Sequence, residues 1–324
     1  MRMVANRSTL QAVPTRAAGP ARSDGSVLAQ GGRVNAMSID VEEYFQVWAF
    51  EDVIDRETWG DLPSRLDICL ERVCTLLAAR NVTATFFVLG WIAERHPHWI
   101  RRLAAAGHEI ASHGYDHRRV TDLSRDEFRA DVDRTRKLLE DLSSSAVIGY
   151  RAPSYSINRE RMWALDVLAQ AGYRYSSSIY PVHHDLYGIP EAPRQPFRHS
   201  SSGLLEIPVT TAKLFGANVP CGGGGYFRFW PYRFSRWAIR RVNSVDGMPA
   251  VFYFHPWEVD AEQPHVERAR LKSRFRHYLN LRRMEKRLAR LLGDFSWDRM
   301  DRVFLLSGAS QNARPWPDRL AANQ

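Results

Sequence analysis

Two histidines four residues apart, His113 and His117, form the first pattern that could do chemistry. On a helical turn this spacing puts both imidazoles on one face, within reach of a single metal ion. Such a pair on its own is more often incidental. An acidic cluster, Asp40-Val41-Glu42-Glu43, could supply a third ligand. Two histidines and one carboxylate leave a coordination position open for water, as in hydrolytic metal sites, and a second carboxylate of the cluster could act as a base.

The elements that must position these residues alternate along the chain. Apolar, strand-like segments are expected at 36–41, 82–89, 108–112, 147–150, 173–176, 204–210 and 250–254. Helical periodicity is expected at 64–80, 91–105, 121–142, 159–171 and 231–243, and Ser124 and Glu127 have the spacing of a capping box. Strands that alternate with helices indicate parallel βαβ units, in an open α/β sheet or a barrel.

Polar clusters fall at the ends of four of these strands. They are Asp40–Glu43, His113–His117, Arg151–Ser156 and His255. In both open α/β sheets and barrels, catalytic groups gather at the carboxyl ends of parallel strands. We therefore expect these clusters to meet in one site. The irregular stretch 177–235 interrupts the alternation, and we expect it to form functional surface.

Five segments in this order resemble the polysaccharide deacetylase family with the NodB homology domain. They are SIDVEEYF (38–45), ATFFVLG (84–90), GHEIASHGYDH (107–117), RAPSYS (151–156) and FYFHPWE (252–258). Together with GGGGYFR (222–228), they are more narrowly similar to the deacetylase-like proteins of bacterial exopolysaccharide and exosortase systems. The resemblance covers about residues 37–290 and implies a divergent, incompletely closed (β/α)7–8 barrel.

The resemblance also implies roles for the first two clusters. Asp40 matches the family's general base, and the metal-binding acid that follows it directly is replaced by Val41. Other branches use an acid two residues after the base, which makes Glu42 the expected ligand; Glu43 stays open as an alternative. On an extended strand residues 40 and 42 share a face, which favours Glu42. His113 and His117 match the two histidine ligands.

The remaining motifs imply the rest of a catalytic site. Arg151 matches the arginine beside the base, where it would hold Asp40 ionised and oriented. Pro153, Ser154 and Tyr155 match the segment that contributes an oxyanion donor and contacts substrate, and His255 matches the general acid. The family tunes this histidine with an aspartate, whereas Ser176 occupies that place here. Asp185 or another acid would have to substitute for the aspartate.

These correspondences predict a carbohydrate N-deacetylase, a hydrolase of carbon–nitrogen bonds other than peptide bonds. Its substrate would be an N-acetylhexosamine polymer or oligomer, in exopolysaccharide biosynthesis. Its metal would be zinc, with cobalt or manganese as alternatives. Two other functions stay open: a catalytically weak carbohydrate-binding or assembly protein, suggested by Val41 and Ser176, and a hydrolase of small cyclic amides. Sugar rings could stack on Trp48, Trp91, Trp230 or Trp257, and His183 or His184 could contact substrate.

Composition and charge bound the remaining possibilities. The 324 residues are 44% hydrophobic and 25% charged, an ordinary globular composition, and the three cysteines suggest no disulfide. No apolar run approaches the length of a membrane span, and the arginine-rich start does not resemble a secretory signal, so we expect a cytoplasmic protein, peripheral to the inner membrane at most. We expect a disordered or misassigned extension (1–36), a NodB-like domain (37–297) and a polar tail (298–324).

Most of the net charge of +9 lies in two appendages, the first 33 residues and the segment 266–294. A nearly neutral body argues against nucleic acid as partner. The basic amphipathic helix expected at 266–292 could contact an anionic membrane or a protein, although the simpler interpretation is that its apolar face packs on the barrel.

Overall fold

The computed structural model describes residues 32–184, 187–308 and 310–316. Its strands are β1 (Asn35–Val41), β2 (Thr85–Val88), β3 (Glu109–Ser112), β4 (Gly149–Tyr150), β5 (Tyr175–Ser176), β6 (Phe197–His199), β7 (Leu205–Glu206), β8 (Thr211–Leu214), β9 (Ala217–Pro220), β10 (Val251–Phe254), β11 (Trp297–Asp298) and β12 (Pro315–Trp316). Its α-helices are α1 (Leu66–Ala78), α2 (Gly90–Arg95), α3 (Pro97–Ala105), α4 (Arg125–Ser143), α5 (Trp163–Gln170), α6 (Gly224–Phe229), α7 (Tyr232–Ser244), α8 (Leu271–Tyr278) and α9 (Leu281–Asp294).

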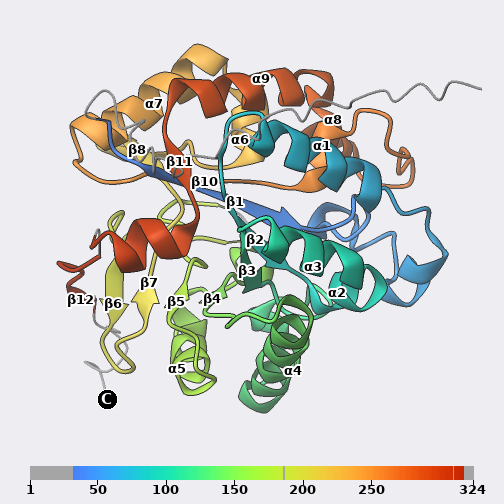
Figure 1. Cartoon of the computed structure of the whole chain (residues 1–324), viewed down its shortest axis with the longest axis horizontal. Coiled ribbons are helices and arrows are strands. Elements are labelled where there is room, and N and C mark those ends of the chain that lie inside the picture. The colour runs from blue at the N-terminus through green and yellow to red at the C-terminus, as the bar shows by residue number, and fades with distance from the viewer. Residues whose placement is uncertain (1–31, 185–186, 309, 317–324) are drawn as a thin grey trace, which may run out of the picture. The chain divides into compact units, whose positions relative to one another are not determined.

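The main sheet runs in the order β10-β1-β2-β3-β4-β5-β7-β6-β12, with β11 beside β1 (Figure 1). From β10 to β7 the neighbouring strands are parallel, and the later pair β6–β7 is antiparallel. Among the described residues β10 and β12 do not pair, so the sheet stays open. This confirms the expected α/β fold with an incompletely closed barrel.

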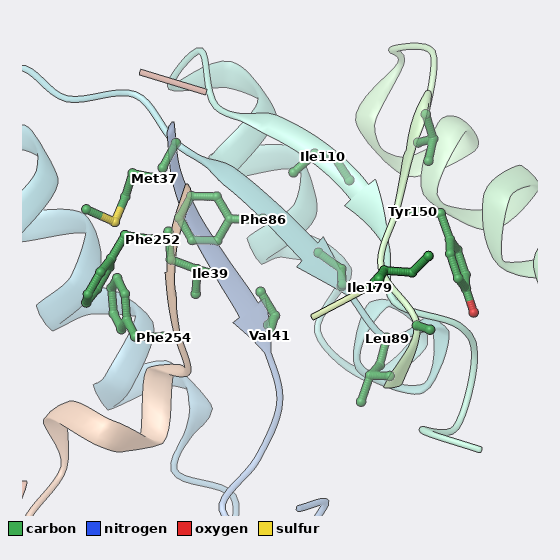
Figure 2. Packing of buried hydrophobic residues seen from close by; sticks show 14 of the residues in the cluster. Met37, Ile39, Val41, Phe86, Leu89, Ile110, Tyr150, Ile179, Phe252 and Phe254 are labelled. Atoms are coloured by element: carbon green, nitrogen blue, oxygen red, sulfur yellow. The ribbon is translucent and has the colours of Figure 1, made fainter. Parts of the chain in front are cut away.

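Alternation along β1 divides the core into two layers. Figure 2 shows Met37, Ile39 and Val41 packed with side chains of neighbouring strands, and these residues belong to the large cluster that the helices cover. Ser38 and Asp40 face the opposite side, because successive side chains of a strand point to opposite faces. There Arg151 bonds to both of them. The alternation of the strand therefore places the apolar side chains on the face that the helices cover, and Ser38 and Asp40 on the opposite face.

The inner side of the sheet holds a smaller apolar cluster that the C-terminal segment completes. Met300, Val303 and Phe304 are buried there, beside Phe87 and Tyr175. The expected polar tail from residue 298 thus begins with residues that belong to the core. The expected N-terminal extension falls, up to residue 31, outside the described residues, and β1 begins at Asn35.

Two expected helices are each divided in two. The helix expected at 91–105 is interrupted at His96-Pro97, which separates α2 from α3. The basic helix expected at 266–292 is interrupted at Asn280, whose φ of +55° is a left-handed conformation that ends α8 and starts α9. The apolar side chains of α9 are buried, as the simpler interpretation predicted, whereas Leu271 and Phe275 of α8 are exposed. All three cysteines are free.

Candidate active site

Glu42, His113 and His117 meet at the carboxyl ends of β1 and β3. Glu42 Oε1 lies 3.0 Å from His113 Nε2 and 3.1 Å from His117 Nε2. All three side chains are buried, and one ligand atom from each lies within 4.8 Å of the others. The sequence motifs predict this trio, and the structure brings it together.

The orientation of His113 suits a metal ligand. Its Nδ1 lies 2.8 Å from the Arg151 carbonyl oxygen, so Nδ1 carries the proton and donates it there. In the neutral ring Nε2 then presents a lone pair toward a carboxylate oxygen. Two lone pairs in contact repel each other, so a cation between them stabilises the arrangement. A backbone acceptor on the far nitrogen is also the usual support of a metal-bound histidine.

The loop between the two histidines is held from behind by Asp131 of α4. Its Oδ1 accepts a hydrogen bond from the Tyr115 N–H at 3.0 Å. Gly114 has φ +74° and His117 has φ +58°, so the loop makes two left-handed turns to aim both imidazoles at Glu42. A left-handed non-glycine residue costs energy and is typical of functional loops.

Glu43 contacts the start of α1 and not the two histidines. Its carboxylate bonds to the Ser64 hydroxyl and accepts from the backbone N–H groups of Arg65 and Leu66 at the start of α1. Glu43 therefore caps a helix and faces away from the histidines. The structure decides the open choice of the acid nearest the histidines in favour of Glu42, as the alternation of the strand predicted.

Asp40 and Arg151 form a buried ion pair next to the trio. Arg151 Nη1 lies 2.5 Å from Asp40 Oδ1, and the side chains of Arg151 and Asp40 are 0% and 2% exposed. The other donors of the guanidinium bond to Ser38, Ser177 and the Met300 sulfur, and its carbon lies 4.1 Å from the centre of the Phe87 ring. Burial by itself lowers the pKa of Arg151, but the Asp40 carboxylate outweighs it and raises the pKa. Asp40 is thus oriented by a cation that stays charged.

The segment Pro153–Tyr155 follows β4 and borders the same cavity. Ser154 has φ +54° and Tyr155 has φ +51°, two consecutive left-handed residues. Ser154 and Tyr155 line a cavity of about 250 Å³, together with Asp40, the trio and His255. This cavity is called the catalytic cleft below. Pro153 is buried and is not among the residues that line this cavity.

His255 enters the catalytic cleft from the end of β10. Its Nε2 lies 3.8 Å from Glu42 Oε1, and its Nδ1 lies 2.9 Å from Glu258 Oε1. Glu258 is fully buried, and its second oxygen accepts from Arg228 Nε at 2.6 Å. Burial raises the pKa of Glu258, but Arg228 and His255 outweigh it and lower the pKa to about 2. Burial lowers the pKa of His255, but the Glu42 and Glu258 carboxylates raise it to about 9.

Glu258 is the acid that the sequence analysis did not assign. Ser176, at the family's aspartate position, donates to the Ser178 hydroxyl at 2.8 Å. Asp185, the substitute named from the sequence, lies outside the described residues. A signal was present in HPWE, since a Glu three residues after a strand-ending residue is the spacing of a capping box, and the structure shows that motif.

A second cavity of about 400 Å³, called the side groove below, adjoins the catalytic cleft. The two share Tyr187, His255 and Trp257 among their lining residues, and His184 and Phe275 border the side groove alone. His184 stacks on Tyr187 with ring centres 3.8 Å apart.

The remaining aromatic candidates divide between the cleft and packing. Trp48 and Trp257 line the catalytic cleft. Trp91 packs on Trp59 at 5.7 Å, and Trp230 packs between Phe229 and Phe234. His183 is exposed and lines neither cavity.

Two family models match adjoining parts of the chain. Residues 58–176 match the model described as polysaccharide deacetylase, and residues 177–305 match a domain of unknown function, DUF3473. The first range holds His113, His117 and Arg151, and the second holds Arg228, His255 and Glu258. Asp40 and Glu42 precede both. The catalytic cleft therefore draws on both matched regions.

Curated relatives match about a third of the chain. A peptidoglycan-N-acetylglucosamine deacetylase of Bacillus cereus is 33% identical over 96 residues, 29% of this chain and 35% of that protein. Two chitooligosaccharide deacetylases, from Rhizobium leguminosarum and Sinorhizobium fredii, are 29% and 39% identical over 115 residues. These matches cover 36% and 34% of this chain. The chain thus spans 49% and 48% of the two rhizobial proteins.

A crystal structure from Mycobacterium smegmatis, named as a candidate polysaccharide deacetylase, shares the fold. Its TM-score is 0.54 at 20% identity, and the alignment covers 89% of this chain and 95% of that one. The ordered motifs, the cleft and the matched models agree. The chain carries a polysaccharide deacetylase domain of the NodB type, continued by a DUF3473 region.

Proposed function

We propose that this protein is a metal-dependent hydrolase that removes N-acetyl groups from an N-acetylhexosamine polymer or oligomer during exopolysaccharide biosynthesis. Glu42, His113 and His117 would hold the metal, and their nitrogen and carboxylate donors suit zinc. When bound there, a divalent metal would polarise the acetyl carbonyl and acidify water. Cobalt and manganese have compatible ligand preferences.

The side chains around the trio supply the proton transfers. Asp40, held by Arg151, accepts a proton from the attacking water. Ser154 lines the cleft, and its backbone N–H would donate to the acetyl oxygen as negative charge develops there. His255 donates its Nε2 proton to the departing amine, while its Nδ1–H remains on Glu258. The products are acetate and an amino sugar.

One observation carries this proposal. A base held by a buried arginine and a histidine held by a buried carboxylate line the same cavity as the trio. Metal amidohydrolysis needs these three components together. The names of the curated relatives agree with amide hydrolysis on N-acetylglucosamine units.

The test is acetate release from N-acetylglucosamine oligomers and exopolysaccharide by the zinc-loaded full chain. Asp40→Asn should lower the rate by about 100-fold or more, because a general base contributes that much. His113→Ala should abolish both metal binding and acetate release. Glu43→Gln is the matched control, since Glu43 faces α1. Acetate release no greater than that of Asp40→Asn on every polymer tried would contradict the proposal.

The other two functions predict different results in the same assay. If the protein only binds or assembles carbohydrate, the wild type and the Asp40→Asn variant should bind saccharide equally well. Neither should release acetate. The serine at position 176 was one reason to consider this function. It counts for less because Glu258 supplies a carboxylate partner for His255. A hydrolase of cyclic amides would turn over allantoin-like compounds faster than oligosaccharides.

A further inference from the structure

The positive charge of the chain is concentrated on three helices. Together α7, α8 and α9 carry twelve arginine and lysine residues against two acids, whereas the whole chain has a net charge of +9. All the rest of the chain is therefore close to neutral. The three helices lie along one border in Figure 1, on the side opposite α4 and α5. Helices α7 and α8 contain no acid at all.

Large apolar side chains are exposed among these charges. Leu271 and Phe275, one turn apart on α8, are 81% and 62% exposed. On α7, Trp237 is 41% exposed and continues a series of ring contacts through Phe234 and Trp230 to Phe229. This series reaches the side groove, which Phe229 and Phe275 both line. The aromatic series from α7 and Phe275 of α8 therefore both reach the side groove.

The β8–β9 hairpin extends the same surface. It packs beside α7, and Arg241 donates to the Lys213 carbonyl at 3.1 Å. Phe215 stands at its tip, 99% exposed, with φ +49°. Glycine or asparagine is favoured in such a turn, and the Phe215 side chain is almost entirely exposed there. The exposed part of α7, α8 and this tip is called the basic aromatic face below.

We infer that the basic aromatic face binds an anionic lipid surface. Arginines attract the phosphate headgroups, while exposed Phe, Trp and Leu side chains enter the boundary between headgroups and acyl chains. The exposed aliphatic side chain of Leu271 favours this ligand over a polysaccharide, since sugar rings stack on flat aromatic side chains. No helix among the described residues is long and apolar enough to cross a membrane. The side groove opens beside this face and would place the cleft near the lipid.

The test is co-sedimentation of the full chain with vesicles of phosphatidylcholine alone or with about one third phosphatidylglycerol. We expect binding to the anionic vesicles, weakened by salt. The double variant Phe215→Ser/Leu271→Ser should lower the affinity for anionic vesicles about tenfold or more, because two apolar side chains that would be buried in the bilayer are removed. Arg233→Gln/Arg240→Gln should lose about tenfold at low salt. None of these residues lines the catalytic cleft.

The matched control is Ile68→Ser/Leu306→Ser, which removes two exposed aliphatic side chains outside this face. It should bind like the wild type. Three results would overturn the inference: no binding to anionic vesicles, equal binding to neutral ones, or equal loss in the control. Retention on an acidic polysaccharide resin without vesicle binding, abolished by Phe215→Ser/Leu271→Ser, would assign the face to a glycan. Because this readout needs no turnover, it is independent of the proposed activity.

Discussion

Glu258 occupies both hydrogen-bond donors of His255 that point away from the catalytic cleft. Its Oε1 lies 2.9 Å from His255 Nδ1 and 3.0 Å from the His255 backbone nitrogen. Arg228 fixes the other oxygen of the carboxylate and donates to the carbonyl groups of His277 and Leu279. His255 Nε2 is therefore left facing Glu42 and the cleft, where it can donate a proton.

Replacing Glu258 by Gln should impair the donation of that proton selectively. An amide substrate releases an amine, which must be protonated as it leaves, so we expect acetate release from oligosaccharides to fall about 100-fold. An aryl acetate releases a phenolate that needs little protonation. Its hydrolysis should fall less than about threefold, and the KM for oligosaccharide should change little.

The two substrates together separate positioning from structural damage. If Glu258→Gln merely distorted the cleft, hydrolysis of the amide and the aryl ester would fall alike. Glu206→Gln is the control, because Glu206 is equally buried but bonds to the backbone of Ser178 and Ile179. It should not change the ratio of the two rates.

Most of the candidate site was predictable, because each motif stands at a strand end and the parallel sheet brings those ends together. The carboxylate partner of His255 was not predicted, because the family's aspartate corresponds to Ser176, which has no carboxylate. The spacing from His255 to Glu258 was visible, but the sequence does not show that Arg228, thirty residues earlier, would neutralise this acid. A buried carboxylate depends on that distant partner.

Gly224 leaves the space that Glu258 occupies. A Cβ at residue 224 would lie 2.2 Å from Glu258 Oε1, whereas a Cβ at residue 225 would meet nothing within 4 Å. Gly224→Ala should therefore displace Glu258 and reproduce the selective loss of amide hydrolysis. Gly225, in the same helix, lines the cleft, but Gly225→Ala should leave Glu258 in place, so it should keep the ratio of amide to aryl ester hydrolysis and stabilise the fold by up to about 1 kcal/mol. Equal rates in the two variants would contradict the packing argument.

Metal binding should distinguish two adjacent glutamates. Glu42→Gln removes a charged ligand, so we expect the affinity for zinc to fall at least about tenfold. Glu43→Gln should keep the metal but lower the free energy of unfolding by about 1 kcal/mol, because Glu43 caps α1. Metal analysis after dialysis and urea unfolding measure the two effects. Loss of metal from Glu43→Gln alone would reverse our assignment.

Removing only one partner of the Asp40–Arg151 ion pair should destabilise the fold more than removing both. Arg151→Met leaves a buried carboxylate without its cation, which should lower the free energy of unfolding by about 3–5 kcal/mol. Adding Asp40→Asn removes the unpaired charge, so the double variant should be more stable than Arg151→Met. Urea unfolding of the two single variants and the double variant gives this coupling. Additive losses would mean that the pair contributes no interaction.

The order of strands and helices was predicted well, but the breaks within helices were not. Hydrophobic periodicity located the alternating strands and helices, but the basic helix reads as continuous through Asn280, because a single residue in a left-handed conformation leaves the apolar spacing intact. The burial of Met300 and Phe304 was also missed. The apolar run VFLL (303–306) is too short to indicate a core element from the sequence, and the open inner side of the sheet gives Met300 and Phe304 a place to pack.

Stability should depend on pH through His108. Its Nδ1 accepts from the Ala84 N–H at 3.1 Å, and burial, with a smaller effect of Arg299, lowers its pKa to about 4. The unfolded chain, with a histidine pKa near 6.5, binds this proton first as pH falls. Between about pH 6.5 and 4 the wild type should therefore lose on the order of 2–3 kcal/mol relative to His108→Asn. Urea unfolding across this range measures the difference. His98→Asn, at an exposed histidine, is the control, and a gap between wild type and His108→Asn that stayed constant with pH would mean that His108 is protonated equally in both states.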